Sequence, residues 1–91
     1  KNPSWRDIIW TKAACHLVTT RKPNFLMFHL LNTDAVNHSH GPGSFGSFTA
    51  YAFADRLLGD LIDAVKQAGL ADKTTYVITT DHGFKKVKKV I

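Results

Sequence analysis

Two pairs of aspartate and histidine stand out as groups that could bind divalent metal ions. In the first pair Asp34 precedes His38 by four residues, and in the second pair Asp81 and His82 are adjacent. Carboxylate oxygen and imidazole nitrogen suit Zn²⁺ and, less selectively, Mn²⁺ or Fe²⁺. Each residue taken singly is more often a turn former or a hydrogen-bonded surface group, so the coincidence of two pairs carries the prediction of a metal site. His40, two residues beyond the first pair, could contact a substrate or have no role.

Both pairs lie just beyond segments that have the composition of β-strands. Residues 25–31 form a nearly continuous apolar run, typical of an interior strand, and residues 75–80 are rich in β-branched side chains. Between them an amphipathic helix is predicted from about Ser44 or Ser47 to Ala68. A strand–helix–strand unit implies parallel strands joined by a right-handed crossover. The two pairs should therefore emerge at the same edge of a sheet, within about 10 Å of each other.

The remaining elements are predicted from local signals. A first helix should run from Ser4 to about Thr20, with Ser4 as its N-cap and Asp7 as a capping-box partner. Gly69 should end the later helix in the C′ position. Residues 32–46 are rich in Gly, Asn and Ser and are predicted to be a loop, in which a tight turn brings the first Asp/His pair together.

The element order of helix, strand, loop, helix and strand indicates an α/β fold. Two strands are too few for a parallel sheet, which normally has several strands and both faces covered by helices. We therefore expect a fragment of a doubly wound, mostly parallel sheet sandwich. With 91 residues the chain is at most one small domain, and residues 1–91 are expected to form a single, incomplete domain.

Charge and composition limit the possible partners. The chain has 12 Lys and Arg against 7 acidic residues, all of them Asp, for a net charge of +5. Four of the cations lie in the C-terminal stretch KKVKKVI, so the preceding body is nearly balanced. A nucleic-acid interface normally spreads its cations along a face with interleaved aromatic residues, so nucleic-acid binding is not expected.

No run approaches the roughly 20 apolar residues of a membrane-spanning helix. The single Cys15 cannot form an internal disulfide.

Two motifs carry a resemblance to a known family. The stretch TDAVNHSHGP has the form Asp-x-x-x-His-x-x-Gly-Pro and is followed, after the predicted helix, by VITTDHGF. Together they resemble the alkaline phosphatase superfamily, most closely the type I phosphodiesterase/nucleotide pyrophosphatase family. The similarity covers about residues 23–84 and includes the order and approximate spacing of the motifs.

The resemblance implies an alkaline phosphatase-like sandwich and a phosphoesterase with two zinc ions. By that resemblance Asp34 and His38 would bind one zinc, with a further His from later in the chain. Asp81 and His82 would bind the other, beside an Asp and a Thr or Ser nucleophile from earlier in the chain. No residue of this sequence is assigned as the nucleophile, and no substrate-binding residue is assigned.

The expected function is that of a zinc-dependent hydrolase of phosphodiester or pyrophosphate bonds in nucleotides or related organic phosphates, with other divalent metals as alternatives to zinc. The 91 residues alone should be inactive. One alternative is another hydrolase of the superfamily, such as a phosphomonoesterase, a phosphonate hydrolase or a sulfatase-like protein. Another is a basic nucleic-acid-binding module without catalysis. Relatives are often secreted or membrane-anchored, and the sequence leaves compartment, substrate and oligomeric state open.

Overall fold

The structure is a computed structural model that describes residues 3–80, 82 and 83, and within them it consists of helices and extended segments. Three α-helices follow one another, α1 (Pro3–Thr20), α2 (Asn32–His40) and α3 (Phe45–Gln67), and a short 3-10 helix, η1 (Ala71–Lys73), comes after them. The described residues contain no β-strand. The predicted α/β fragment with a mostly parallel sheet is therefore wrong for this structure, which is helical.

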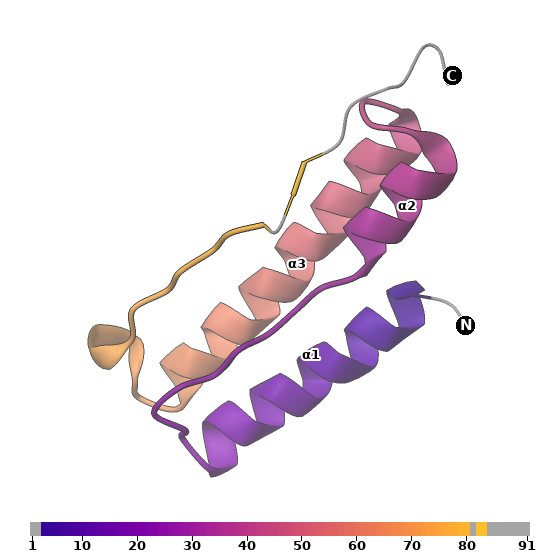
Figure 1. Cartoon of the computed structure of the whole chain (residues 1–91). Helices are drawn as coiled ribbons and strands as arrows, with labels where there is room; N and C mark the ends of the chain where they lie inside the picture. The colour runs from indigo at the N-terminus through magenta and orange to yellow at the C-terminus, as the bar shows by residue number, and fades with distance from the viewer. Residues whose placement is uncertain (1–2, 81, 84–91) are drawn as a thin grey trace.

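The core lies between α1 and α3, which run side by side and in the same direction (Figure 1). Five buried residues form it, and they come from the second halves of both helices. Partly buried Cys15, Phe28 and Leu70 pack against this cluster. The buried members are Ala14, Val18, Leu61, Ala64 and Val65.

The two predicted strands are extended segments without strand pairing. The chain from the end of α1 to α2 and the chain from η1 to residue 80 both run back toward the end of the molecule where α2 lies (Figure 1). Several of their apolar side chains face solvent, with Phe25 80%, Met27 81% and Val77 84% exposed, whereas Phe28 packs against the core. A strand is stable only when its backbone bonds to a neighbour and its face packs on other elements. The prediction of an interior strand at residues 25–31 is therefore wrong here.

The ends of the long helices follow the local signals. At the start of α3, the backbone N–H of Ser47 donates a 3.1 Å hydrogen bond to Oγ of Ser44, which is the N-cap. At its end Gly69 has a φ of 77°, in the left-handed region. The N–H of Gly69 donates to the carbonyl of Lys66 at 3.0 Å, and that of Leu70 donates to the carbonyl of Val65 at 3.1 Å. This bonding pattern is a Schellman motif, which confirms the predicted C′ role of Gly69.

Helix α2 lies in the stretch predicted to be a loop. It has nine residues and ends before Gly41, whose φ of 87° interrupts the helical backbone. Asn37 lies inside the helix and is 3% exposed. Its side chain can be buried there because it forms a hydrogen bond with Ser47. The loop prediction failed because these stabilising contacts come from other parts of the chain.

None of the helices in the described part of the chain combines the length and the hydropathy needed to cross a lipid bilayer.

Candidate functional site

Asp34 and His38 lie on one face of α2. Oδ1 of Asp34 is 3.3 Å from Nε2 of His38, and both side chains are accessible, with 47% and 66% of their surfaces exposed. Residues four apart in an α-helix are neighbours on its surface. The prediction that these two side chains lie together is correct. The helix brings them together, and not the predicted tight turn.

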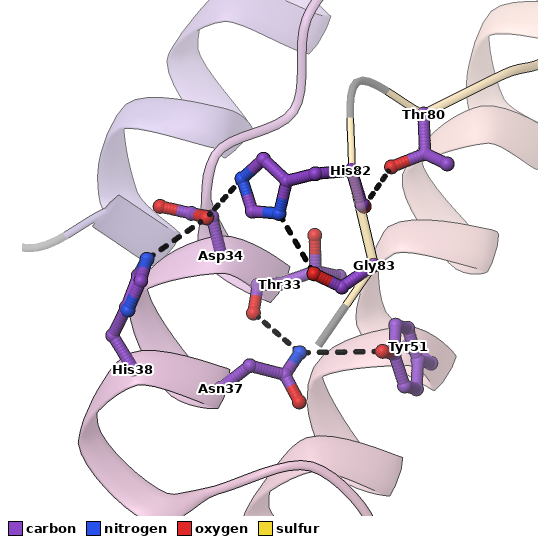
Figure 2. Close-up of polar contacts among 8 residues, drawn as sticks. All are labelled: Thr33, Asp34, Asn37, His38, Tyr51, Thr80, His82 and Gly83. Carbon is purple, nitrogen blue, oxygen red and sulfur yellow. Dashed lines mark hydrogen bonds and ion pairs between the residues drawn. The ribbon is translucent and has the colours of Figure 1, made fainter. Parts of the chain in front are cut away.

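His82 approaches the same carboxylate from a distant part of the chain. Its Nε2 lies 3.4 Å from Oδ1 of Asp34, so this one oxygen lies between the imidazoles of His38 and His82 (Figure 2). The two motifs are therefore as close as expected, within about 10 Å of each other. The described residues contain no sheet, however, so they are not brought together at a sheet edge. Asp81, the remaining predicted ligand, lies outside the described residues.

The hydrogen on the His82 ring can be placed from its second contact. Nδ1 lies 2.9 Å from the backbone carbonyl of Gly83 (Figure 2). A carbonyl oxygen only accepts hydrogen bonds, so Nδ1 carries the hydrogen and Nε2 is the nitrogen that faces Asp34. Metal-binding histidines commonly have this arrangement, with the second ring nitrogen donating to a carbonyl or carboxylate.

A buried polar network fixes α2 against α3, and none of the sequence motifs indicated it. Oδ1 of Asn37 accepts a 2.8 Å hydrogen bond from the hydroxyl of Ser47, which is 0% exposed. The amide nitrogen of Asn37 donates to the carbonyl of Thr33 at 2.7 Å and to the hydroxyl of Tyr51 at 3.3 Å (Figure 2). Ser47 and Tyr51 are four apart in α3, which is the signal that could have indicated a polar face.

Asp7 has a different role from the predicted one. Helix α1 begins at Pro3, so Ser4 lies inside it, and the Asp7 carboxylate accepts backbone N–H bonds at the start of α2. Asp7 is 1% exposed and is among the most buried side chains of the described chain. The capping-box prediction for Ser4 and Asp7 is therefore wrong, and the carboxylate caps another helix.

The other candidates lie apart from this arrangement. His16 and His40 are exposed, and His29 is also exposed, lining a shallow hollow with Trp10 and Met27. A second hollow between α1 and α3 is lined by seven residues and contains none of the four predicted ligands. They are Cys15, His16, Thr19, Asp60, Asp63, Ala64 and Gln67.

Taken alone, the described residues do not complete a metal centre. Within residues 3–80, 82 and 83, no group of three or more His, Cys, Asp and Glu side chains is arranged to hold a metal ion. What they provide is one carboxylate with an imidazole on either side. The basic stretch at the C-terminus lies outside the described residues.

Comparison with known proteins gives a consistent result. The chain is 33% identical over 76 residues to ectonucleotide pyrophosphatase/phosphodiesterase family member 1 of Mus musculus, which covers 84% of this chain and 8% of the relative. It is 31% identical over 71 residues to venom phosphodiesterase 2 of Crotalus adamanteus, covering 78% of this chain and 9% of the relative. The chain thus spans less than a tenth of the length of these relatives.

No solved structure matches the chain significantly. A profile of the type I phosphodiesterase/nucleotide pyrophosphatase family matches residues 4–91, nearly the whole sequence. The chain therefore belongs to the type I phosphodiesterase/nucleotide pyrophosphatase family.

Proposed function

We propose that this chain supplies metal ligands to a zinc-dependent hydrolase that cleaves phosphodiester or pyrophosphate bonds of small organic phosphates. The printed names of its relatives refer to phosphodiesterase and pyrophosphatase activities. The observation that carries the proposal is the position of the Asp34 carboxylate, with Nε2 of His38 at 3.3 Å and Nε2 of His82 at 3.4 Å. These residues come from the two motifs that the sequence singled out.

The donor types and their separations fit zinc. In a tetrahedral site with bonds of about 2.0–2.1 Å, neighbouring ligand atoms are about 3.3 Å apart. The separation between Oδ1 of Asp34 and Nε2 of His38, the two atoms proposed to bind the same ion, is of that size at 3.3 Å. Carboxylate oxygen and neutral imidazole are also the combination that zinc accepts in place of thiolate.

The hydrogen on His82 supports the same proposal. Because Nδ1 donates to the carbonyl of Gly83, Nε2 is the ring nitrogen that lies 3.4 Å from the carboxylate oxygen of Asp34. Imidazole nitrogen and carboxylate oxygen are both ordinary zinc ligands, so one ion held by Asp34 and another held by His82 would lie next to each other.

In the proposed enzyme each described residue has a defined task. Asp34 and His38 would hold one ion, and His82, with Asp81, would hold the other. Bound divalent ions supply Lewis-acid charge that offsets the negative charge of the phosphoryl group and of the leaving oxygen. Gly83 fixes the tautomer of His82 through its carbonyl, and the exposure of Asp34 and His38 leaves their outer side open to a phosphate ester.

The test is metal binding by the purified 91-residue chain and by its variants. Titration with Zn²⁺ in a calorimeter, and with Co²⁺ followed by visible absorption, should show saturable binding by the wild-type chain. His38→Ala and His82→Ala should each weaken it strongly, because each removes one imidazole from the Asp34 carboxylate. The matched control is His16→Ala, which removes an exposed imidazole of α1 and should bind like wild type.

Hydrolysis is measured on the same samples with an aryl phosphodiester. The 91-residue chain should bind metal without turnover. The family resemblance implies that the nucleophile and a further ligand for each ion come from residues outside this sequence. Equal metal affinities for wild type, His38→Ala and His82→Ala would contradict the proposed site, and metal-dependent turnover by the chain alone would contradict its expected inactivity.

A further inference from the structure

Helix α2 carries two of the proposed ligands but is too short to hold its own position. It has nine residues, and isolated helices of that length are marginal in water. Its N-cap residue, Leu31, makes no side-chain hydrogen bond that would cap it. The first N–H groups of a helix have no partner inside the helix, so they need an acceptor from elsewhere.

Asp7 of α1 provides that acceptor from a distant part of the sequence. Its Oδ1 and Oδ2 lie 3.0 and 3.1 Å from the backbone nitrogen of Leu31, and Oδ2 accepts a 2.8 Å hydrogen bond from the N–H of Asn32. The start of α2 lies beside the first turns of α1 (Figure 1). A carboxylate there is also favoured by the positive end of the helix dipole. The contact thus replaces the local cap that the sequence of α2 lacks.

A second contact links the same two helix starts. The hydroxyl of Ser4 donates a 2.8 Å hydrogen bond to Oδ1 of Asn32. Asn32 is two residues before Asp34, so Asp34 lies in the first turn of α2 and His38 follows about one turn later. Any displacement of the start of α2 would therefore move both side chains relative to His82.

We propose that Asp7 is a positioning residue for the metal ligands Asp34 and His38. It touches neither of them, and it acts by fixing the backbone of α2 at Leu31 and Asn32. This inference rests on the proposed function, because positioning matters for chemistry only if the site binds a metal ion. Its structural part, that Asp7 sets the geometry of Asp34 and His38, can be tested without metal.

The test compares Asp7→Asn with the matched control Asp72→Asn, which changes an exposed aspartate outside the three α-helices. Asp7→Asn keeps the size of the side chain but places an NH₂ group against backbone N–H donors. We expect it to weaken Zn²⁺ binding by about tenfold or more, the loss typical of residues that orient metal ligands. It should also alter the Co²⁺ absorption bands, which report the coordination geometry, at temperatures where circular dichroism shows full helix content. Asp72→Asn should change neither property.

Unchanged zinc affinity and Co²⁺ bands in Asp7→Asn, together with shifted amide resonances of Leu31 and Asn32, would overturn the inference. If Asp7→Asn does not fold, Asp7→Glu is used, because it keeps the carboxylate on a stem one methylene longer. A folded Asp7→Glu chain with weakened zinc binding supports the inference, and one with wild-type binding and shifted Leu31 and Asn32 resonances overturns it.

Failure of the proposed function gives a different result. If the wild-type chain binds no zinc, the function proposal is wrong and Asp7 is judged by nuclear Overhauser contacts between the His82 ring and the β-protons of Asp34, which report the position of α2. Loss of these contacts in the folded Asp7 variant, with the packing of α1 on α3 unchanged, supports the positioning role. Their persistence contradicts it.

Discussion

Nε2 of His82 lies 3.4 Å from Oδ1 of Asp34, although 47 residues separate the two in the sequence. Neither residue belongs to a β-sheet in this structure. The contact forms because two extended segments, one before α2 and one after η1, both run back toward the same end of the helix pair (Figure 1). The meeting point of the two motifs therefore depends on the direction of the chain and does not require paired strands.

Asp34→Asn should separate binding from stability. Asp34 is about half exposed, and ion pairs in such positions contribute about 1 kcal/mol or less. We therefore expect a change in the free energy of unfolding of less than about 1 kcal/mol by urea titration. Zinc affinity should fall on the order of 100-fold, since loss of an outer-shell partner alone costs about 10–100-fold. A large loss of stability with unchanged zinc affinity would show that Asp34 is a structural residue and not a ligand.

The buried hydrogen bond between Asn37 and Ser47 should contribute more to the free energy of unfolding than the exposed Asp34–His38 pair does. Ser47→Ala leaves Oδ1 of Asn37 without its donor in a site that is 3% exposed, and such an orphaned acceptor costs about 1–3 kcal/mol. Thermal unfolding should show this loss. Thr49→Ala is the control, because the Thr49 hydroxyl bonds its own helix at an exposed position and its removal should cost less than about 0.5 kcal/mol. Equal effects of the two variants would mean that the network does not fix α2 on α3.

The long helices could be predicted from the sequence because their signals are local. Ser44 caps α3 through a residue three positions away, and Gly69 ends it through bonds within one turn. Helix α2 could not be predicted in this way, because Asp7 and Ser47, which stabilise it, lie 25 residues before its start and 10 residues after Asn37. Its composition alone is that of a loop.

The strand prediction failed for a related reason. Apolar β-branched runs indicate how a segment would pack if neighbouring strands covered it, but they do not supply those neighbours. In the described chain Met27 and Val77 remain in water. The ligand pairs were found from residue type and spacing, whereas Asn37 and Asp7 became visible only through their contacts.

Met27→Ser tests the exposed position of the segment before α2. Met27 is 81% exposed, so the substitution should change the free energy of unfolding of the 91-residue chain by less than about 0.5 kcal/mol. Leu61→Ala, at a core position that is 8% exposed, should cost about 2–5 kcal/mol in the same urea titration. A loss of several kcal/mol for Met27→Ser would show that this segment is packed in solution.

Two glycines of the same region should respond in opposite directions to alanine. Gly59 lies inside α3 with open space where a Cβ would stand, so Gly59→Ala should raise the free energy of unfolding by about 1 kcal/mol. Gly69 has a φ of 77°, so Gly69→Ala should lower it by about 1 kcal/mol because an L side chain is strained there. Differential scanning calorimetry measures both. Changes of the same sign would show that the Schellman motif is absent in solution.

The Cys15 thiol should make stability depend on pH in the alkaline range. Burial raises the pKa of Cys15 above its ordinary value, and the negative charge of Asp60 raises it further, while Lys12 opposes both. The unfolded chain therefore releases the thiol proton first, so the free energy of unfolding should fall as pH rises above about 8.5, the ordinary thiol pKa.

Asp60→Asn should lower the pKa of Cys15, measured by thiolate absorbance. Asp63→Asn is the control, because Asp63 lines the same hollow without contributing to the shift. Iodoacetamide should correspondingly alkylate Cys15 more slowly than a free cysteine at pH 8, and equal rates would contradict the raised pKa.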